Sequence, residues 1–390
     1  MKAPRPAFLI CAYYFFYFGA VGCLAPYIAI YYQRVGLSGE QIGWLSGLGP
    51  IVLLLSGPLW GAIGDRFNLH RQLLPLATVG VIIPTLIMAH SARFGPLVVL
   101  VLLLSFFSTA IGPLMDSAAL EISEITQVPF GRLRIWGSIG FTLIATALGW
   151  LLKWIGVEWL FYSYAACMAM AALVALPLPA RQHHWRAPIQ QGFQQLLAQP
   201  SFIIFLGAAL LVGASIMAVS YFFPLHIKAI GGDTNLIGLA NAVAALAEMP
   251  VLFRADTLLK RVGGLWAALV ISTAAYVARW WFLASATTPA AILLLQLMHS
   301  VTFGLFLVAS IAYVNAQAPK GLSATAQSLL IAAMWGVGPT LGAIGGGVIY
   351  ARYGAPTLFR LASAVTVAAL GLLLVLRFVK HQPSTAIELP

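Results

Sequence analysis

Long apolar segments separated by short polar turns follow one another along the whole chain. About 20 consecutive apolar residues are enough for a helix to cross a bilayer. By this measure the sequence predicts an all-α membrane protein with twelve transmembrane helices. The expected spans are residues 7–33, 40–64, 72–90, 95–120, 132–153, 157–178, 201–227, 234–256, 264–285, 289–315, 322–350 and 354–378.

The longest polar stretch, residues 179–200, divides these spans into six and six. We therefore predict an N-terminal six-helix bundle at 1–178, a cytoplasmic central loop at 179–200 and a second six-helix bundle at 201–390. A faint internal repeat supports this division, since Ile42-Gly43 and Ile237-Gly238 each lie near the start of a span. Two related bundles about an axis along the membrane normal resemble the arrangement of major facilitator transporters.

Composition and charge agree with a membrane protein. Hydrophobic residues make up 61% of the chain and charged residues only 8%, against about 25% charged residues in soluble proteins. The net charge of +11 does not indicate a nucleic-acid partner, because the basic residues lie in short loops and form no run. Most of these loops lie on the same side as the N-terminus, so the positive-inside rule places both termini in the cytoplasm. We expect a multi-pass protein of the bacterial cytoplasmic (inner) membrane that functions as a monomer in the lipid bilayer.

Several classes of function are disfavoured by the motifs. The sequence contains no HExxH, GxSxG or Walker pattern, so we predict no enzyme and no catalytic residue. The three cysteines lack CxxC and Cys/His spacing, so no metal site is expected. A channel or a signalling receptor remains an alternative to a transporter.

The stretch between the second and third spans resembles the loop signature of the major facilitator family. It contains Gly61, Asp65 and Arg66, followed by further basic residues. A glycine allows close helix approach, the acid can lie near the positive end of a helix, and the arginine can pair across the interface of the halves. We predict that these three residues form a cytoplasmic gate.

Glycine is dense in the predicted span 322–350, which includes Gly338, Gly342 and Gly346 around Pro339. Small residues let helices approach closely, and a Gly-Pro pair allows a bend. We therefore expect this helix to be pliable and closely packed.

Ionisable residues also occur inside the apolar segments. Asp116 and Arg134 lie about 6–12 Å from the cytoplasmic end of their spans. Glu248, Arg279 and His299 lie near mid-membrane in the second half. Such groups cost several kcal/mol unless they are paired or hydrated, so we predict a polar cavity at the interface of the halves. A snorkelling anchor is the alternative for Arg134.

Residues 130–141, FGRLRIWGSIGF, resemble the fifth-helix motif of the lactose permease (oligosaccharide:proton symporter) family. The resemblance implies that Asp116 and Arg134 form a central solute-binding pair and that Phe141 stacks on the solute. It continues through the acid, arginine and histidine of the eighth to tenth helices, here Glu248, Arg279 and His299.

One residue departs from that pattern, since Thr302 occupies the place of a proton-carrying glutamate. The sequence His299-x-x-Thr302, together with Ala247-Glu248 and Arg279-Trp280, looks closer to the phenylpropionate permease branch. Because threonine cannot carry the proton, Glu248 or Asp116 is expected to do so.

These observations predict a proton-coupled symporter that works by alternating access, with the proton gradient as driving force and no cofactor. The expected solute is a small organic molecule, with an aromatic monocarboxylate such as a phenylpropanoid acid slightly ahead. Arg134, Arg279 and protonated His299 could meet its carboxylate. Ring contacts are expected from Tyr13, Tyr17, Phe141 and Trp280 if these side chains face the cavity. A sugar or nucleoside symporter and an uncoupled facilitator are the alternatives.

Overall fold

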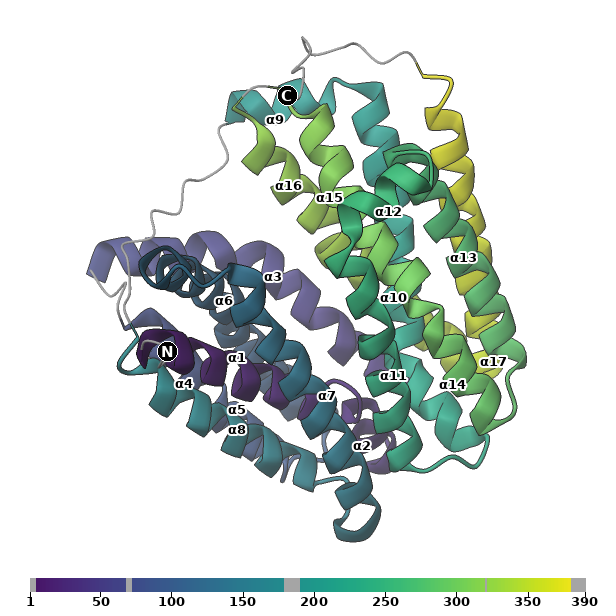
Figure 1. The fold of residues 1–390 in the computed structure, drawn as a ribbon. Helices are drawn as coiled ribbons and strands as arrows, with labels where there is room; N and C mark the ends of the chain where they lie inside the picture. Colours follow the sequence, from purple (N-terminus) through teal and green to yellow (C-terminus); the bar gives the residue numbers. More distant parts are fainter. Residues whose placement is uncertain (1–4, 68–71, 179–189, 320, 380–390) are drawn as a thin grey trace. The chain divides into compact units, whose positions relative to one another are not determined.

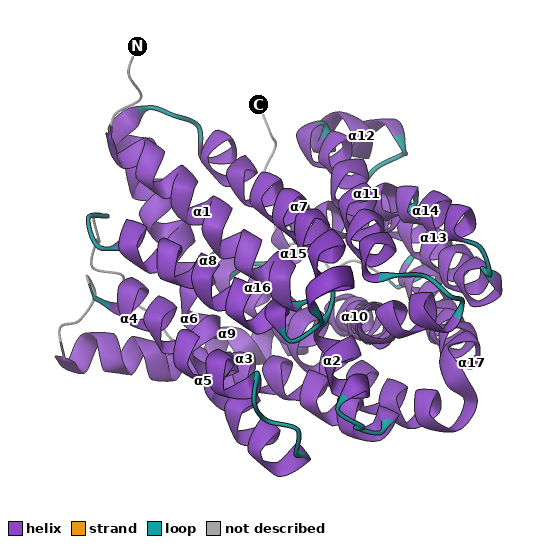
Figure 2. Cartoon of the chain, turned by 90° about the horizontal axis from the view of Figure 1, so that it is seen from below, coloured by secondary structure: helices purple, strands orange, loops and turns teal. Residues whose placement is uncertain are grey.

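The computed structural model describes residues 5–67, 72–178, 190–319 and 321–379, and every regular element in these ranges is a helix (Figures 1 and 2). The chain divides into two compact units. Unit 1 comprises residues 1–186 and 221–245, and unit 2 comprises residues 187–220 and 246–390. This boundary crosses two helices and so differs from the predicted division at residues 179–200, which stays a prediction.

The described residues of unit 1 form eight helices together with parts of α10 (Pro200–Ala229) and α11 (Thr234–Phe253). Two of the predicted spans consist of two helices each, and the first of them is interrupted near Pro26, as expected for a residue that lacks the amide hydrogen. The helices are α1 (Arg5–Leu24), α2 (Ile28–Arg34), α3 (Gly39–Phe67), α4 (Leu73–Gly80), α5 (Ile82–Met88), α6 (Phe94–Thr126), α7 (Phe130–Ile155) and α8 (Trp159–Ala175).

Unit 2 contains the remaining helices and two π-helical turns. The final helix has a break at Gly354, whose φ of 76° is left-handed, between the predicted spans 322–350 and 354–378. The elements are α9 (Gln190–Leu197), α10 (Pro200–Ala229), α11 (Thr234–Phe253), α12 (Ala255–Arg261), α13 (Leu265–Ser285), α14 (Pro289–Leu297), η1 (Ser300–Gly304), α15 (Leu305–Gln317), α16 (Ser323–Ile331), η2 (Ala332–Val337) and α17 (Gly338–Leu376).

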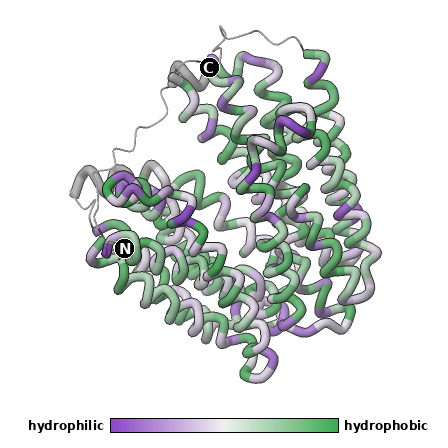
Figure 3. Tube along the Cα trace, viewed as in Figure 1, coloured by the Kyte–Doolittle hydropathy of each residue, from purple (hydrophilic) through white to green (hydrophobic). Residues whose placement is uncertain are grey.

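Eight helical segments in the described residues are long and apolar enough to cross a membrane. Two shorter apolar segments, Leu73–Met88 and Trp159–Ala175, add to these, and Ser323–Leu376 is a single segment of 54 residues that contains the break. Hydrophobic residues extend along most of the length of these helices (Figure 3). A multi-pass membrane protein is therefore supported, while the count of twelve spans and the cytoplasmic termini stay predictions.

The predicted gate residues lie at the end of α3. Residues 61–67 belong to this helix, so the stretch interpreted from the sequence as a loop is helical at least to Phe67. Isolated glycines are common in membrane helices, and Gly61 and Gly64 do not end this one. The structure describes only the backbone at Gly61, Asp65 and Arg66, so the role of these residues as a gate stays a prediction.

Glycines set the closest helix crossings in each unit. In unit 1, Gly140 of α7 packs against the backbone of Phe15 on α1. In unit 2, Gly338 and Gly342 of α17 pack against the backbone of Leu210 and Ala214 on α10. A side chain at these positions would separate the two backbones. The close packing predicted for span 322–350 is therefore confirmed.

A seam of small residues explains why residues 221–245 group with unit 1. Thr234 Oγ1 of α11 donates to the Gly149 carbonyl of α7 at 2.7 Å, and Tyr27 Oη donates to the Ala145 carbonyl at 2.6 Å. A Cβ at Gly149 would lie 2.5 Å from Tyr27 Oη, and one at Gly238 would lie 2.6 Å from it. We call these five residues the α7–α11 seam.

An ion pair lies beside the seam. Lys153 Nζ of α7 lies 2.8 Å from Asp233 Oδ2, and Lys228 Nζ lies 3.8 Å from Asp233 Oδ1. All three side chains are more than a third exposed. The Lys153 ammonium, and secondarily that of Lys228, lowers the pKa of Asp233 below its usual value.

Candidate functional site

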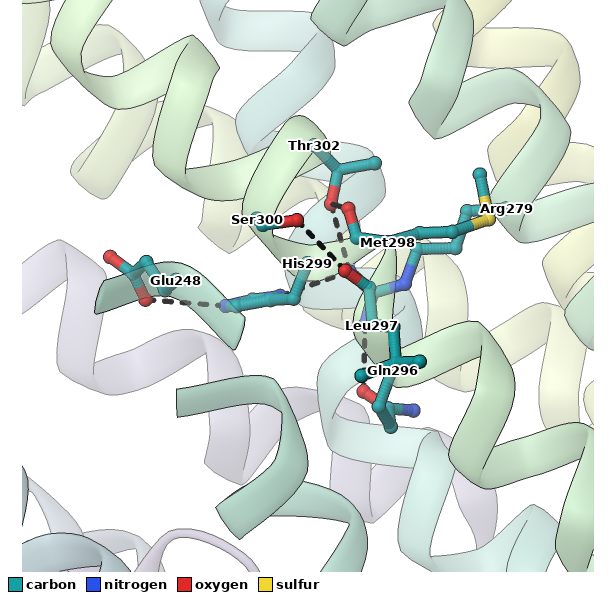
Figure 4. A network of polar contacts seen from close by, with 8 residues as sticks. All are labelled: Glu248, Arg279, Gln296, Leu297, Met298, His299, Ser300 and Thr302. Atoms are coloured by element: carbon teal, nitrogen blue, oxygen red, sulfur yellow. Dashed lines mark hydrogen bonds and ion pairs between the residues drawn. The ribbon is translucent and has the colours of Figure 1, made fainter. Parts of the chain in front are cut away.

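Arg279 of α13 is the centre of a polar cluster in unit 2 (Figure 4). The residue is 4% exposed, and all of its hydrogen-bond partners are neutral. Its Nη2 donates to Gln296 Oε1 at 2.7 Å, and its Nη1 donates to Thr302 Oγ1 at 3.0 Å and to His299 Nδ1 at 2.9 Å. We call Glu248, Tyr276, Arg279, Gln296, His299 and Thr302 the Arg279 cluster.

The spacing of the acceptors in the chain explains why they converge on one guanidinium. Gln296, His299 and Thr302 follow one another at intervals of three residues, so they share a face of the helix that runs from α14 into η1. Thr302 Oγ1 also donates to the Met298 carbonyl at 2.8 Å, which leaves an oxygen lone pair to accept from Arg279. Thr302 thus holds the arginine in place, a role that sequence reasoning did not assign.

The contact with Arg279 fixes the tautomer of His299. Because a guanidinium can only donate, Nδ1 must be the acceptor and carries no proton. A neutral His299 therefore has its hydrogen on Nε2, which lies 3.7 Å from Glu248 Oε2. A protonated His299, as expected for binding a carboxylate, would have to give up this hydrogen bond, so that role stays a prediction.

Glu248 of α11 lies beside His299, the most exposed side chain of the cluster. The side chains of His299 and Glu248 are 25% and 17% exposed, whereas Arg279 is buried. A Cβ at Gly304 would lie 3.2 Å from Glu248 Cγ, so η1 approaches the stem of the glutamate closely. Glu248, His299 and Arg279 form a chain of contacts that runs from a partly accessible acid to a buried cation.

Two buried donors of the cluster have no partner among the described residues. These are Arg279 Nε and Tyr276 Oη, one helical turn apart on α13. A buried donor without an acceptor costs about 1–3 kcal/mol, and such groups in native structures tend to have a functional reason. Sequence reasoning missed Tyr276 and Gln296, although both lie three residues from a predicted site residue.

Asp116 and Arg134 lie in unit 1. Tyr14 Oη of α1 donates to Asp116 Oδ1 of α6 at 2.6 Å. Arg134 is exposed on α7, and it makes no ion pair with Asp116 or with any other residue that the structure describes. Arg134 is the fifth residue of α7, and its side chain is accessible there. Tyr14, which we did not predict, is therefore the direct partner of the acid.

The predicted aromatic residues differ in accessibility. Tyr17 and Phe141 are half-buried in unit 1, so each keeps an exposed part. Tyr13 is fully buried and its hydroxyl shares a 2.6 Å hydrogen bond with Thr78 Oγ1. Trp280 is 4% exposed and its Nε1 donates to Ser215 Oγ at 3.3 Å. Tyr13 and Trp280 thus expose little ring surface in this arrangement, and the ring contacts stay a prediction.

The helical architecture and the buried charges agree with three comparisons. A family model described as the MFS_1-like family matches residues 8–361. The maltose permease of Geobacillus stearothermophilus is 32% identical over 370 residues, which cover 93% of each chain. The probable 3-phenylpropionic acid transporter of Escherichia coli K12 is 23% identical over 318 residues, 78% of this chain and 81% of that one. The crystal structure of the nucleoside transporter NupG superposes with a TM-score of 0.87 at 17% identity, over 97% of this chain and 100% of that one.

This chain belongs to the MFS_1-like family of the major facilitator superfamily. The predicted resemblance to that superfamily is confirmed, and its members are transporters rather than enzymes. The similarity in structure to NupG concerns the fold alone.

Proposed function

We propose that this protein is a proton-coupled symporter that moves a small, hydroxyl-rich solute, with a sugar first, by alternating access across the bacterial cytoplasmic membrane. The observation that carries this proposal is the enclosure of Arg279 by Gln296, His299 and Thr302. Arg279 is 4% exposed and already donates to three acceptors, so a solute carboxylate in the accessible part of the site reaches little of its guanidinium. The preference for an aromatic monocarboxylate is therefore replaced by a preference for a neutral solute.

The partly exposed groups suit hydroxyls. Glu248 supplies a carboxylate acceptor, and Asp116, with Tyr14 beside it, supplies a second. The guanidinium of Arg134 supplies hydrogen-bond donors. Hydroxyl groups both donate and accept, so a sugar suits the polar groups of either unit taken by itself, whereas a carboxylate only accepts. The maltose permease that is 32% identical to this chain supports the same class.

Glu248 is the proposed proton carrier. His299 is unsuited to that role while its Nδ1 accepts from Arg279. Protonation of Glu248 removes the negative charge that faces the Nε2 hydrogen of His299. The imidazole is then held less firmly, and its hydrogen bond with Arg279 weakens. Binding of the proton and of the solute would then be coupled energetically through one chain of contacts. Asp116 is the second candidate for the carrier.

An aromatic monocarboxylate is the second candidate for the solute. Arg134, which is exposed and makes no ion pair with a described residue, favours it, as does the similarity to a probable 3-phenylpropionic acid transporter. A nucleoside is a further alternative for the solute, and uncoupled facilitation is the alternative to proton symport. The protein is expected to act as a monomer with the proton gradient as its driving force.

Solute-dependent proton movement in proteoliposomes tests the proposal. Maltose, a nucleoside and phenylpropionate are offered in turn, and the external pH is recorded for the wild type, Arg134→Ala and the control Arg132→Ala. We expect maltose to drive external alkalinisation in the wild type and in Arg132→Ala but not in Arg134→Ala. Alkalinisation by phenylpropionate alone would replace the sugar with the second candidate. Counterflow of maltose without proton movement would establish a facilitator.

A further inference from the structure

Two π-helical turns lie close together in unit 2. The first, η1, directly follows His299, and the second, η2, lies before the glycine-rich start of α17. A π turn is wider than an α turn and less favourable, and such turns occur frequently at functional sites. Both turns lie in apolar segments, where no sequence signal predicted them.

Each π turn carries one aromatic residue of a three-ring stack. The Phe303 ring lies parallel to the His299 imidazole, with centroids 5.0 Å apart and planes 10° apart. The Trp335 ring meets Phe303 edge to face, with centroids 5.9 Å apart. These are favourable geometries for aromatic pairs. The stack therefore joins η2 to the Arg279 cluster through η1.

The rings of this stack are accessible while their neighbours are buried. Phe303 and Trp335 are half-buried, whereas the flanking residues Thr302, Gly304, Met334 and Gly336 are buried. Phe303 lies on the face of His299, which is itself partly exposed beside Glu248. Ionisable side chains inside a membrane segment face the protein interior or a water-filled cavity. We infer that the Phe303 ring, which stacks on His299, borders the surface on which His299 and Glu248 are exposed.

We propose that Phe303 and Trp335 form a ring-binding wall that holds the apolar face of a cyclic solute, while Glu248 binds its polar edge. The proposal rests on the proposed transport function and adds the residues that select a ring. Solute sites combine aromatic walls with a few placed polar groups, and the Phe303 ring of this wall stacks on His299, which in turn contacts Glu248. A pyranose fits this pairing, because its C–H face is apolar and its edge carries hydroxyls.

Counterflow with graded solute concentrations tests the wall. The variants are Trp335→Leu, the ring-retaining Trp335→Phe, and the control Trp281→Leu, which removes a lipid-accessible tryptophan that is 55% exposed on α13. An aromatic contact worth about 0.5–1.5 kcal/mol corresponds to a rise of roughly 2- to 12-fold in half-saturation concentration. We expect that rise for maltose in Trp335→Leu, a smaller one in Trp335→Phe and none in Trp281→Leu. The proton-to-solute ratio should not change.

Phe303→Leu and Phe303→Tyr provide the second pair if Trp335→Leu does not fold, with the rise expected only in the leucine variant. If the half-saturation concentration for maltose is the same in the wild type and in the leucine variants, the proposed ring-binding wall is excluded. If the wild type carries phenylpropionate but not maltose, the sugar proposal fails, while the wall still predicts the rise for phenylpropionate. A wild type that carries none of these ring solutes overturns both.

Discussion

Arg279 Nη1 lies 2.9 Å from His299 Nδ1, so the imidazole accepts a hydrogen bond from a buried cation. The Nδ1 lone pair is thereby engaged, and Glu248, whose Oε2 lies 3.7 Å from the other ring nitrogen, is the acid of the cluster. We therefore expect Glu248 rather than His299 to take up the proton.

Replacing Glu248 by Gln should abolish uphill accumulation while leaving counterflow within a few-fold of the wild type. The amide keeps the size of the side chain but cannot exchange a proton. Accumulation driven by an imposed pH gradient, measured beside counterflow in the same proteoliposomes, separates the two effects. Asp116→Asn is the comparison for the second candidate. Uphill transport that survives in Glu248→Gln would exclude this residue as the carrier.

Gln296 should be important for stability because it accepts from the buried guanidinium at 2.7 Å. Gln296→Leu leaves a charged donor without its partner, at a cost of about 1–3 kcal/mol. Gln296→Glu keeps an acceptor and adds a counter-charge. Melting in detergent should therefore rank Gln296→Leu below both the wild type and Gln296→Glu. A leucine variant as stable as the wild type would show that Gln296 is dispensable for holding Arg279.

The α7–α11 seam should not tolerate even a methyl group. In Gly149→Ala the new Cβ would lie 2.5 Å from Tyr27 Oη and 2.7 Å from the Thr234 carbonyl oxygen. Overpacking of this kind typically costs about 1–3 kcal/mol. The control is Gly112→Ala on α6, where a Cβ would meet no described atom within 4 Å. We expect a lower melting temperature for the first variant only. An equal change of melting temperature in Gly149→Ala and Gly112→Ala would argue against tight packing in the α7–α11 seam.

The ion pair beside the seam should make a small, pH-dependent contribution to stability. Because its lysine partners lower the pKa of Asp233, the stabilisation is present above the unfolded-state pKa and is lost as the pH falls through the folded-state value. Asp233→Asn should therefore be less stable than the wild type near neutral pH and equal to it once the pH has fallen below the folded-state pKa of Asp233. The difference should stay within about 1 kcal/mol, since the pair is exposed.

Melting of the wild type, Asp233→Asn, Lys153→Met and the double variant at several pH values measures this contribution. The double variant should be no less stable than either single one, because both substitutions remove the same contact. Full additivity at neutral pH would mean that the two residues act independently.

The sequence determined the class of the protein and the identity of its embedded ionisable residues. In a bilayer every backbone polar group must be bonded within its own segment, so a long apolar segment can only be a helix. An ionisable residue in such a segment is conspicuous because its burial is costly. Both signals are local, and they identified Asp116, Glu248, Arg279 and His299 without any tertiary information.

Tertiary structure decided the partners. Tyr14 and Asp116 are 102 residues apart in the chain, and Arg279 meets Gln296 and Thr302 from another helix. Equal depth in the membrane suggested that Asp116 and Arg134 could pair, but contact also depends on how each helix is rotated and where it crosses its neighbours. Glycines such as Gly149 and Gly338 set those crossings through backbone contacts with distant segments. The pattern of apolar residues along the chain determines how deep in the membrane a residue lies. Only the packing of the helices determines which way its side chain points.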